Sequence, residues 1–379
     1  MLDLAIIGGG PAGLLAAYEA ARSGVEVAVF EKNKEIGVLD RCAGLLSISG
    51  LNMLGIPVNE IYLQNLVNGA VIKTSSGRMY NVDAGRPIAA VVDRRVFDQK
   101  LAERAEKHGA RIFCNRRVSD ISRSGEIFLL KTSSGIRVKA RWIIDAEGAG
   151  AALLKRLFKT APESSKWIPI IQLLVRNHGL DRHYVYIYFK KYLPDFFSYL
   201  IPIDEEYGKL GAASRIPNLN RMLKKFLEEE FPDALVLKRI SYIVYTGYPI
   251  DSIAFFPRRF IPVGDAAGHV KATTGGGVIM GGIISTNIAK AVSEHLIGGD
   301  PSRFLRNARL VLKELRRIAF LRNLVWRLAF SEFYELLLSL LCSNLGNAYL
   351  RRRGDMDFQL SALLGSKHSL YKGISSSVR

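Results

Sequence analysis

The stretch that decides the fold of this chain is Leu4-Ala-Ile-Ile-Gly-Gly-Gly-Pro-Ala-Gly13. Its apolar start is typical of a buried strand, and apolar residues at helical spacing follow it up to Ser23-Gly24. The glycines between them stand in the order Gly8-x-Gly10-x-x-Gly13. Gly8 permits a tight turn, Gly10 lets the backbone approach a pyrophosphate, and Gly13 lets the helix pack closely on the strand. This order predicts a dinucleotide at the helix N-terminus, where free N–H groups favour an anion.

The second predicted strand supports this interpretation. Residues 25–30 are rich in valine, and Glu31 follows them at about the distance from the glycines at which a carboxylate bonds a ribose hydroxyl. Ala12, inside the glycine turn, and Lys32, next to Glu31, complete the candidate cofactor-binding residues of this strand–helix–strand unit.

A second glycine-rich segment indicates which dinucleotide binds. Residues 260–268 read Phe-Ile-Pro-Val-Gly264-Asp265-Ala-Ala-Gly and predict a strand followed by a turn. A carboxylate at this turn can accept hydrogen bonds from a polyol chain, which FAD has and NAD lacks. A helix then opens with Gly275, Gly276, Gly277 and Val278. Its bare backbone suits the pyrimidine edge of a flavin, where negative charge accumulates on reduction. The alternative is a turn whose glycines serve close packing alone.

The chain as a whole is predicted to be an α/β protein with a Rossmann-type FAD-binding domain. Residues 167–255 interrupt that domain with runs of Ile, Val, Tyr and Phe and one helix, a pattern typical of a mostly antiparallel sheet that serves as the substrate domain. The predicted parts are therefore the FAD-binding domain at 1–166, with small insertions, and at 256–300, the antiparallel sheet at 167–255, a C-terminal helical segment at 301–350 and a loosely ordered polar tail at 351–379.

Four segments in this order resemble the flavoprotein superfamily of para-hydroxybenzoate hydroxylase type, and within it the geranylgeranyl reductase family. They are GGGPAG at 8–13, RCAGLLS at 41–47, DRRVFDQKL at 93–101 and VGDAAGHVKATTGGGV at 263–278, and the similarity covers roughly residues 1–300. The resemblance implies that Arg94 contacts the FAD pyrophosphate or ribityl region, that Asp265 binds the ribityl chain, and that Gly276 and Gly277 contact the flavin ring. A surface arginine beside Arg95 is the alternative for Arg94.

The segment Arg41-Cys42-Ala43 is what points to the reductases rather than the hydroxylases. In that family the cysteine lies near the flavin and the substrate cavity. Cys42 is therefore a candidate catalytic residue that shapes the cavity or adjusts flavin reactivity, with a small buried residue as the alternative.

Three departures from the family leave the substrate open. Where the family has Tyr-x-Trp-x-Phe-Pro on a strand lining the lipid cavity, this chain has Phe197-Ser-Tyr199-Leu-Ile-Pro202, without the tryptophan. Ala272 replaces a proline, and Glu147 replaces the aspartate of an Ala-Asp-Gly motif. Tyr199 is a candidate proton donor by its position, with core packing as the other interpretation.

The resemblance implies reduction of isolated double bonds in prenyl chains of isoprenoid lipids, by hydride from reduced flavin and protonation in a dry cavity. No second strand–GxGxxG–helix unit is present, so electrons arrive from NADPH that docks transiently or from a ferredoxin-like donor. A flavin monooxygenase of the same superfamily and a non-catalytic FAD-binding protein on the membrane are the alternatives.

Composition bears on location and partners. The net charge of +18 calls for an acidic partner or surface, or reflects a solvated basic surface. Three distant cysteines make no disulfide framework, six histidines lack ligand spacing, and neither a signal peptide nor a spanning helix is evident. We therefore expect a cytoplasmic protein without metal or nucleic acid. A basic amphipathic helix at 303–327 predicts contact with the anionic inner face of the membrane, or else packing on the protein body.

Overall fold

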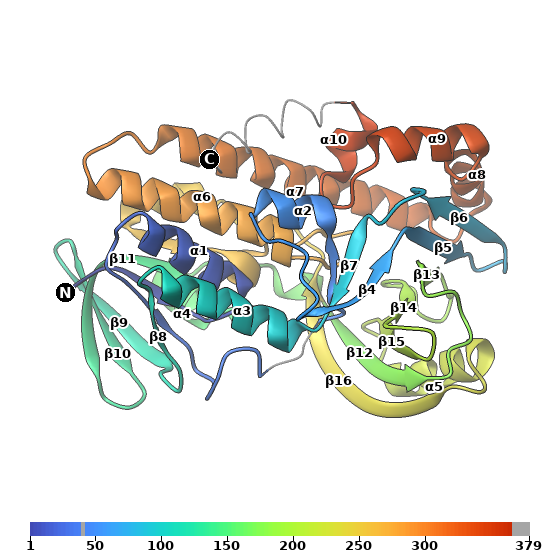
Figure 1. Cartoon of the computed structure of the whole chain (residues 1–379), viewed down its shortest axis with the longest axis horizontal. Coiled ribbons are helices and arrows are strands. Elements are labelled where there is room, and N and C mark those ends of the chain that lie inside the picture. The colour runs from blue at the N-terminus through green and yellow to red at the C-terminus, as the bar shows by residue number, and fades with distance from the viewer. Residues whose placement is uncertain (39–41, 366–379) are drawn as a thin grey trace.

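A computed structural model describes residues 1–38 and 42–365 and has two large sheets joined by a small one (Figure 1). The first sheet has the strand order β8-β2-β1-β11-β10-β9, with β17 beside β11. Its strands are β1 (Leu2–Ile7), β2 (Val27–Phe30), β8 (Arg111–Phe113), β9 (Val118–Ser124), β10 (Ile127–Thr132), β11 (Arg137–Asp145) and β17 (Phe260–Pro262). The α/β fold class predicted from the sequence is confirmed.

Strand β1 lies inside this sheet and is buried on both faces. Leu4 and Ile6 belong to one core cluster, whereas Ala5 and Ile7 belong to the other. A continuous apolar run, rather than an alternating one, is what a strand covered on both faces requires. Helices α1 (Pro11–Arg22), α3 (Arg94–Lys107) and α6 (Val278–Leu296) supply the first cluster, and α4 (Ala152–Phe158) packs on the second.

Strand β11 holds the sheet together because it pairs in two ways. Its first half is antiparallel to β10, with Phe128 opposite Ala140, and its second half is parallel to β1 and β17. One strand of nine residues, Arg137–Asp145, thus serves both kinds of pairing.

The second large sheet forms the other end of the molecule, as predicted for residues 167–255, but it also recruits earlier residues. Its order is β16-β12-β15-β14-β13-β5-β6, and β5 pairs with β13 in parallel. The strands are β5 (Gly69–Lys73), β6 (Met79–Asp83), β12 (Trp167–Arg176), β13 (Tyr184–Tyr188), β14 (Ser198–Pro202), β15 (Tyr207–Ala213) and β16 (Leu235–Tyr245). Residues 69–83, inside the first FAD-binding part that was predicted to carry small insertions, thus belong to this sheet. Helix α5 (Leu219–Glu230) packs on this sheet through Leu223 and Phe226.

A small three-stranded sheet lies between the two large ones (Figure 1). It consists of β3 (Leu45–Ser47), β7 (Ala89–Val92) and β4 (Leu63–Val67), and α2 (Ile48–Met53) follows β3 directly. Short 3-10 helices η1 (Ser164–Lys166), η2 (Ser252–Arg258) and η3 (Gly264–Ala267) complete the connections. Strand β3 begins three residues after Cys42, so this sheet helps to set the position of Cys42.

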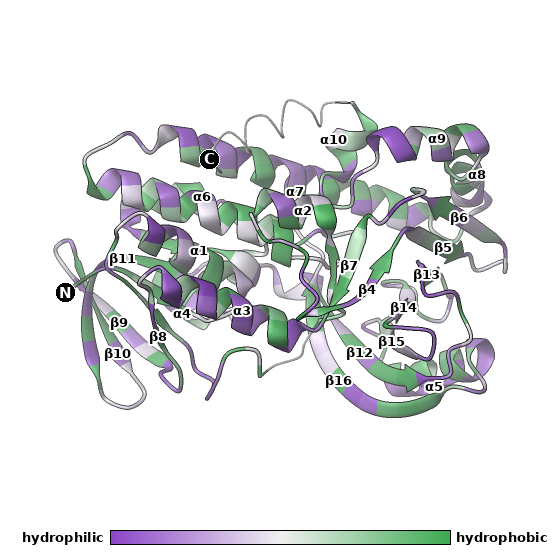
Figure 2. Cartoon of the chain, in the orientation of Figure 1, coloured by the Kyte–Doolittle hydropathy of each residue, from purple (hydrophilic) through white to green (hydrophobic). Residues whose placement is uncertain are grey.

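The C-terminal part is helical, as predicted for 301–350, and comprises α7 (Ser302–Leu328), α8 (Glu332–Leu341), α9 (Asn344–Arg353) and α10 (Gln359–Leu363). Helix α7 runs along α6 (Figure 1), and Val311, Leu315 and Ile318 are buried. Helix α7 has both polar and apolar residues along its length, whereas α6 is more apolar (Figure 2). Over residues 1–38 and 42–365, no helix combines the length and apolar character needed to span a bilayer.

The prediction of a loosely ordered polar tail was wrong for residues 355–363. Asp357, Phe358, Ser361 and Ala362 are buried, and Phe358 belongs to the main core cluster. Residues 366–379 of that prediction lie outside the described residues.

Candidate active site

The glycine turn after β1 has the geometry that its sequence order predicts. Gly8 has φ +103°, and a Cβ atom there would lie 2.2 Å from the carbonyl oxygen of Ala146, at the end of β11. A Cβ atom on Gly13 would lie 2.1 Å from the Gly8 oxygen. A Cβ atom on Gly10 would meet no atom within 4 Å. Two glycines therefore serve close packing, and Gly10 faces open space.

Glu31 lies where the sequence places it, at the carboxyl end of β2. Its Oε2 accepts a 2.7 Å hydrogen bond from Gly9 N, and its Oε1 accepts a 2.8 Å bond from Asn33 N. The side chain is buried, whereas Lys32 is exposed. The carboxylate is thereby fixed beside the turn, and the ammonium of Lys32 is free to face solvent.

The second glycine-rich segment meets the first, although about 250 positions separate them. Strand β17 continues into Gly264, which has φ +64° and whose Cβ would lie 2.9 Å from the Cβ of Ala12. His269 holds this turn: its Nδ1 accepts from Gly264 N at 3.2 Å, and its Nε2 lies 3.1 Å from Ser252 Oγ. Because Nδ1 accepts, the proton of a neutral imidazole is on Nε2 and is donated to Ser252.

Asp265 follows Gly264 on this turn. Its side chain is exposed, although Gly264 and Ala266 on either side are buried. Loss of solvation nevertheless raises the pKa of this carboxyl, and the positive charge of Arg94 offsets part of the effect. A Cβ on Gly277 would lie 3.2 Å from Asp265 Oδ1, so the turn and the glycine loop face each other.

Both helices that begin at these glycines lack a side-chain cap. Gly10 precedes α1 and Gly277 precedes α6, and neither N-terminus receives a hydrogen bond from a capping side chain. A helix start leaves its first N–H groups without intrahelical partners and carries a partial positive charge. Two such ends, with the carboxylates of Glu31 and Asp265 on the same turns, provide N–H donors that suit the phosphates and ring of FAD.

Cys42 and Arg94 come together on the side of the site where the charge of Arg94 acts on Asp265. Burial opposes the charge of the Arg94 guanidinium, but Asp98 and Cys42 raise its pKa above the usual value. Arg94 donates to both carboxylate oxygens of Asp98, at 3.1 and 3.0 Å. Its side chain is only 11% exposed, so it is not the surface arginine of the alternative interpretation. Cys42 is half-buried, and its Sγ accepts from Gly44 N at 3.4 Å. Arg41 lies outside the described residues, and Ala43 packs on an apolar cluster.

Tyr199 lies close to Cys42 and belongs to a polar cluster on the second sheet. Its hydroxyl donates to Gln172 Oε1 at 2.8 Å and lies 2.9 Å from the Tyr242 hydroxyl. Burial raises the pKa of Tyr199, the bond to Tyr242 lowers it, and the charge of Cys42 raises it again. The candidate catalytic residues Cys42 and Tyr199 thus come from different sheets but share one neighbourhood.

Three charged residues near this site escaped the sequence analysis. Lys209 is buried, donates to Gln64 Oε1 at 2.9 Å, and has its Nζ 3.0 Å from where a Cβ of Gly44 would lie. Lys271 and Asp357 form a buried ion pair at 2.6 Å beside the glycine loop. Lys271 lies inside the motif segment at 263–278, but nothing local indicates that these three side chains pair, because their partners are distant in the sequence.

Glu147, which replaces the family's aspartate, has a structural task. Its Oε1 accepts from Leu153 N and Leu154 N at the start of α4. Burial, together with the negative charge of Glu147, raises the pKa of neighbouring Asp145 well above its usual value. The longer side chain therefore reaches a helix N-terminus.

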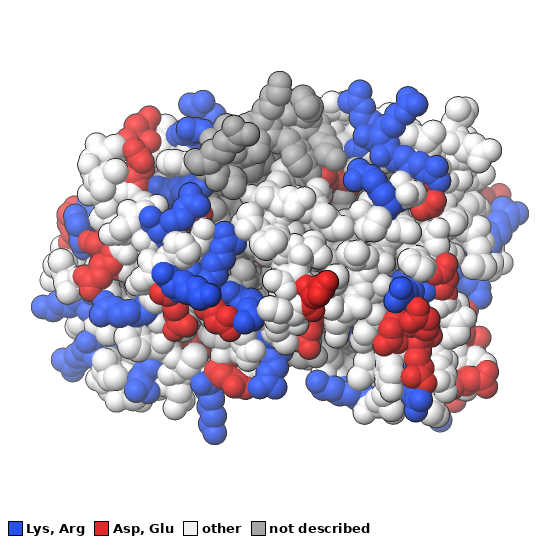
Figure 3. Space-filling model, in the orientation of Figure 1, with Lys and Arg blue, Asp and Glu red and all other residues white. Residues whose placement is uncertain are grey.

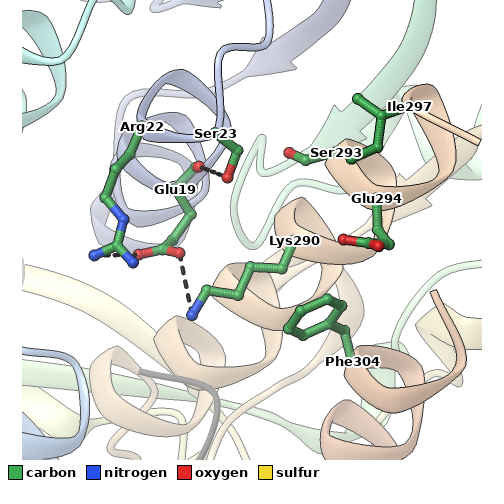
Figure 4. A pocket seen from close by; sticks show the side chains of 8 residues that line it. All are labelled: Glu19, Arg22, Ser23, Lys290, Ser293, Glu294, Ile297 and Phe304. Atoms are coloured by element: carbon green, nitrogen blue, oxygen red, sulfur yellow. Dashed lines mark hydrogen bonds and ion pairs between the residues drawn. The ribbon is translucent and has the colours of Figure 1, made fainter. Parts of the chain in front are cut away.

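A pocket of about 200 Å³ lies elsewhere, between the carboxyl-terminal halves of α1 and α6 (Figure 4). Glu19 and Lys290 form an ion pair at 3.2 Å in its wall. It contains none of the predicted site residues, and Glu19 is roughly 12 Å along α1 from the glycine turn.

Comparison with known proteins agrees with this geometry. Two models described as FAD dependent oxidoreductase match the chain, one at residues 3–155 and the other at 85–291, which is more than half of its length. The chain belongs to the FAD-dependent oxidoreductase family. It is therefore an oxidoreductase, and FAD is its cofactor.

Individual relatives confirm the resemblance to the geranylgeranyl reductases. This FAD-dependent oxidoreductase is 28% identical over 306 residues to the digeranylgeranylglycerophospholipid reductase of Methanococcus vannielii, covering 77% of each chain. It is 27% identical over 385 residues to an uncharacterized protein of Methanocaldococcus jannaschii, MJ1520, covering 98% of this chain and 96% of that one.

Solved structures share the fold. The geranylgeranyl bacteriochlorophyll reductase-like protein of Thermoplasma acidophilum has a TM-score of 0.80 at 23% identity, over 100% of this chain and 98% of that one. The p-nitrophenol 4-monooxygenase of Pseudomonas putida has a TM-score of 0.69 at 16% identity, over 99% and 98%. Reductases and monooxygenases thus use the same framework, and the chemistry depends on the site.

The glycine geometry separates cofactor binding from folding. Gly10→Ala should leave apoprotein stability near wild type, because φ is −80° and the added Cβ faces open space, yet it should weaken FAD binding at least tenfold. Gly13→Ala should destabilise the apoprotein by about 1–3 kcal/mol through overpacking. Urea unfolding of apoprotein and FAD fluorescence titration measure the two effects. Normal FAD affinity in Gly10→Ala would refute the pyrophosphate position.

The buried imidazole of His269 predicts a pH dependence of stability. Burial lowers its pKa from 6.5 to about 4, so below pH 6.5 the unfolded chain binds a proton that the folded chain does not. Stability should therefore fall between pH 6.5 and 4, by on the order of 3 kcal/mol from this group. In His269→Asn the protein should be less stable at pH 7 but lose less stability over this range. Equal pH slopes for the two proteins, measured by urea unfolding, would contradict the assignment.

Proposed function

We propose that this enzyme reduces isolated double bonds in prenyl chains of isoprenoid lipids. The observation that carries the proposal is an apolar cluster directly beside Cys42. The cluster joins the second sheet to the small one and consists of Val67, Ala89, Val91, Val185, Tyr199 and Ile201, with Ala43, Leu45, Ile187, Phe197 and Met356 packed against it. Apolar side chains of this kind suit contact with a hydrocarbon chain and exclude water from the reacting carbons. The name of the Methanococcus vannielii relative supports the same substrate class.

The cofactor assignment uses the residues described above. We propose that Glu31 binds the ribose, that Gly10 and Arg94 face the pyrophosphate, that Asp265 binds the ribityl chain, and that residues 275–278 contact the ring. Bound FAD supplies the hydride once it is reduced. The electron donor is NADPH that binds transiently or a ferredoxin-like protein.

An unconjugated double bond also needs a proton source, because it is a poor hydride acceptor on its own. Tyr199 can take this role, since its raised pKa keeps the hydroxyl protonated at neutral pH. Tyr242 is half-buried and its hydroxyl lies 2.9 Å away, so a proton given up by Tyr199 can be replaced through Tyr242. Gln172 Oε1 accepts from the Tyr199 hydroxyl at 2.8 Å, so the Tyr242 proton can be donated to the Tyr199 oxygen.

An anaerobic absorbance titration tests this function. NADPH, a reduced ferredoxin or dithionite should bleach the flavin, and a geranylgeranyl lipid alone should then restore its absorbance without oxygen. Tyr199→Phe should slow this reoxidation by roughly 10²-fold or more, the usual size of a general-acid contribution. Cys42→Ala should slow it while leaving FAD bound.

Other outcomes of this titration separate the alternatives. Reduced flavin that ignores the lipid but consumes oxygen together with an aromatic or lipid substrate would indicate a monooxygenase. Flavin that no physiological donor reduces would indicate a non-catalytic protein. If reoxidation in Cys42→Ala is unchanged, Cys42 serves only in packing.

We also propose that the enzyme reaches its lipid from an anionic membrane surface, through α8 and α9. The basic helix α7, considered for this role from the sequence, packs much of its apolar face on the protein body. On α8, however, Phe333, Leu336 and Leu340 are 53%, 56% and 60% exposed at helical spacing. Exposed arginines at 351–353 follow on α9, where Lys and Arg gather in Figure 3. Apolar side chains beside cations suit an anionic interface.

Sedimentation with anionic phospholipid vesicles at low salt tests this surface. Leu336→Ser with Leu340→Ser should weaken binding at least tenfold, because each leucine loses about 1.5–3 kcal/mol of apolar transfer when fully buried. Leu235→Ser with Leu237→Ser on β16, at 55% and 52% exposure, is the matched control and should bind normally. Equal losses in both variants would argue against α8 as the contact.

A further inference from the structure

The C-terminal segment at 355–363 returns to the glycine loop through a buried ion pair. Lys271 Nζ lies 2.6 Å from Asp357 Oδ1 and donates to Met356 O at 2.9 Å. The two charged side chains are only 8% and 2% exposed. A pair so well shielded from water interacts strongly with any charge that binds beside it.

Lys271 belongs to the loop that we assign to the flavin ring. Its backbone N–H donates to Gly276 O at 3.0 Å, and its carbonyl accepts from Gly275 N at 2.8 Å. A Cβ on Gly276 would lie 3.0 Å from Lys271 Cε and 3.4 Å from its Nζ. The ammonium group therefore lies beside the loop.

Asp357 connects this loop to the Cys42 side of the site. Its second carboxylate oxygen accepts from the hydroxyl of Ser47, the last residue of β3. Ser47 Oγ also accepts from Gly50 N at 3.0 Å and so caps α2. Next to Asp357, Met356 packs on the apolar cluster that we assign to the substrate.

Anchoring of the C-terminal segment does not require the ion pair. Phe358 is fully buried in the main core. Glu314 on α7 accepts from Leu360 N at 3.0 Å and from Ser361 N at 3.1 Å. Burying two charges costs desolvation energy that an apolar pair of similar size would avoid. A role for the charges themselves is therefore the stronger explanation.

We propose that Lys271 and Asp357 are a positioning pair that sets the reduction equilibrium of the bound flavin. Negative charge that develops at the pyrimidine edge on reduction is favoured by the Lys271 ammonium and disfavoured by the Asp357 carboxylate. The pair thus balances two opposite influences on the flavin while it holds Met356 against the substrate wall. The inference rests on the FAD part of the proposed function and not on the prenyl substrate.

Equilibrium reduction of the FAD-loaded proteins against a reference dye tests the pair. Lys271→Met should lower the equilibrium constant for reduction at least tenfold, which is about 30 mV for a two-electron couple. Asp357→Asn should raise it by a similar factor, and the double variant should lie near wild type. Lys271→Arg keeps the charge and should change the constant little.

Lys290→Met is the matched control. Lys290 pairs with Glu19 at 3.2 Å, with side chains 9% and 7% exposed, in the pocket of Figure 4 away from the flavin loop. This variant should lose thermal stability as Lys271→Met does, but its flavin should keep the wild-type equilibrium. Apoprotein melting curves provide the comparison and need no cofactor.

Opposite shifts in Lys271→Met and Asp357→Asn support the proposal, since a loosened fold has no reason to reverse sign with charge. Shifts in the same direction, or no shift in folded and FAD-loaded Asp357→Asn, would overturn it. If Lys271→Met fails to bind FAD, Asp357→Asn and Lys271→Arg still decide the question. None of these measurements uses a lipid, so a failure of the prenyl substrate assignment would be seen separately.

Discussion

The close approach of β1 to the end of β11 is the constraint on which the site depends. No side chain fits between Gly8 and the Ala146 carbonyl, so the two strand ends are held nearly in contact. Strand β17 is on the other side of β11, and a Cβ on Gly264 after its end would lie 2.9 Å from the Cβ of Ala12. Because parallel strands present their carboxyl ends at one edge, these contacts place two helix N-termini at the same edge of the sheet. A larger residue at either glycine would separate the two halves of the cofactor site.

Local patterns sufficed to predict the FAD-binding framework. Strand β1 is buried on both faces, so its sequence is a continuous apolar run, and the turn after it requires glycines at fixed positions. The carboxylate of Glu31 follows from the same spacing. The antiparallel sheet was also predicted, because runs such as Trp167–Arg176 are long and rich in β-branched and aromatic residues. In these regions, burial and backbone geometry restrict the residue types strongly.

The rest could not be predicted, because it depends on contacts between distant residues. Lys271 and Asp357 are 86 positions apart, and each is an ordinary charged residue in its own segment. Phe358 is one apolar residue near several polar ones, so no periodic signal distinguished its buried segment from a solvated tail. Strands β5 and β6 resemble any surface hairpin until their parallel pairing with β13 is known. Tertiary contacts, rather than propensity, decided these three cases.

Reduction of an isolated double bond makes two opposed demands on the proposed site, since a hydrocarbon chain needs apolar walls and the chemistry needs charge and protons beside it. Unpaired polar groups would spoil such a wall, because burying them costs several kcal/mol each. Here the polar groups already satisfy one another: Arg94 bonds Asp98, and Tyr199 bonds Gln172. The Lys271–Asp357 pair follows the same rule. Charges arranged in bonded pairs can act on the flavin through space while an apolar chain lies next to them. Pairing therefore allows charged groups and a hydrocarbon substrate to share one site.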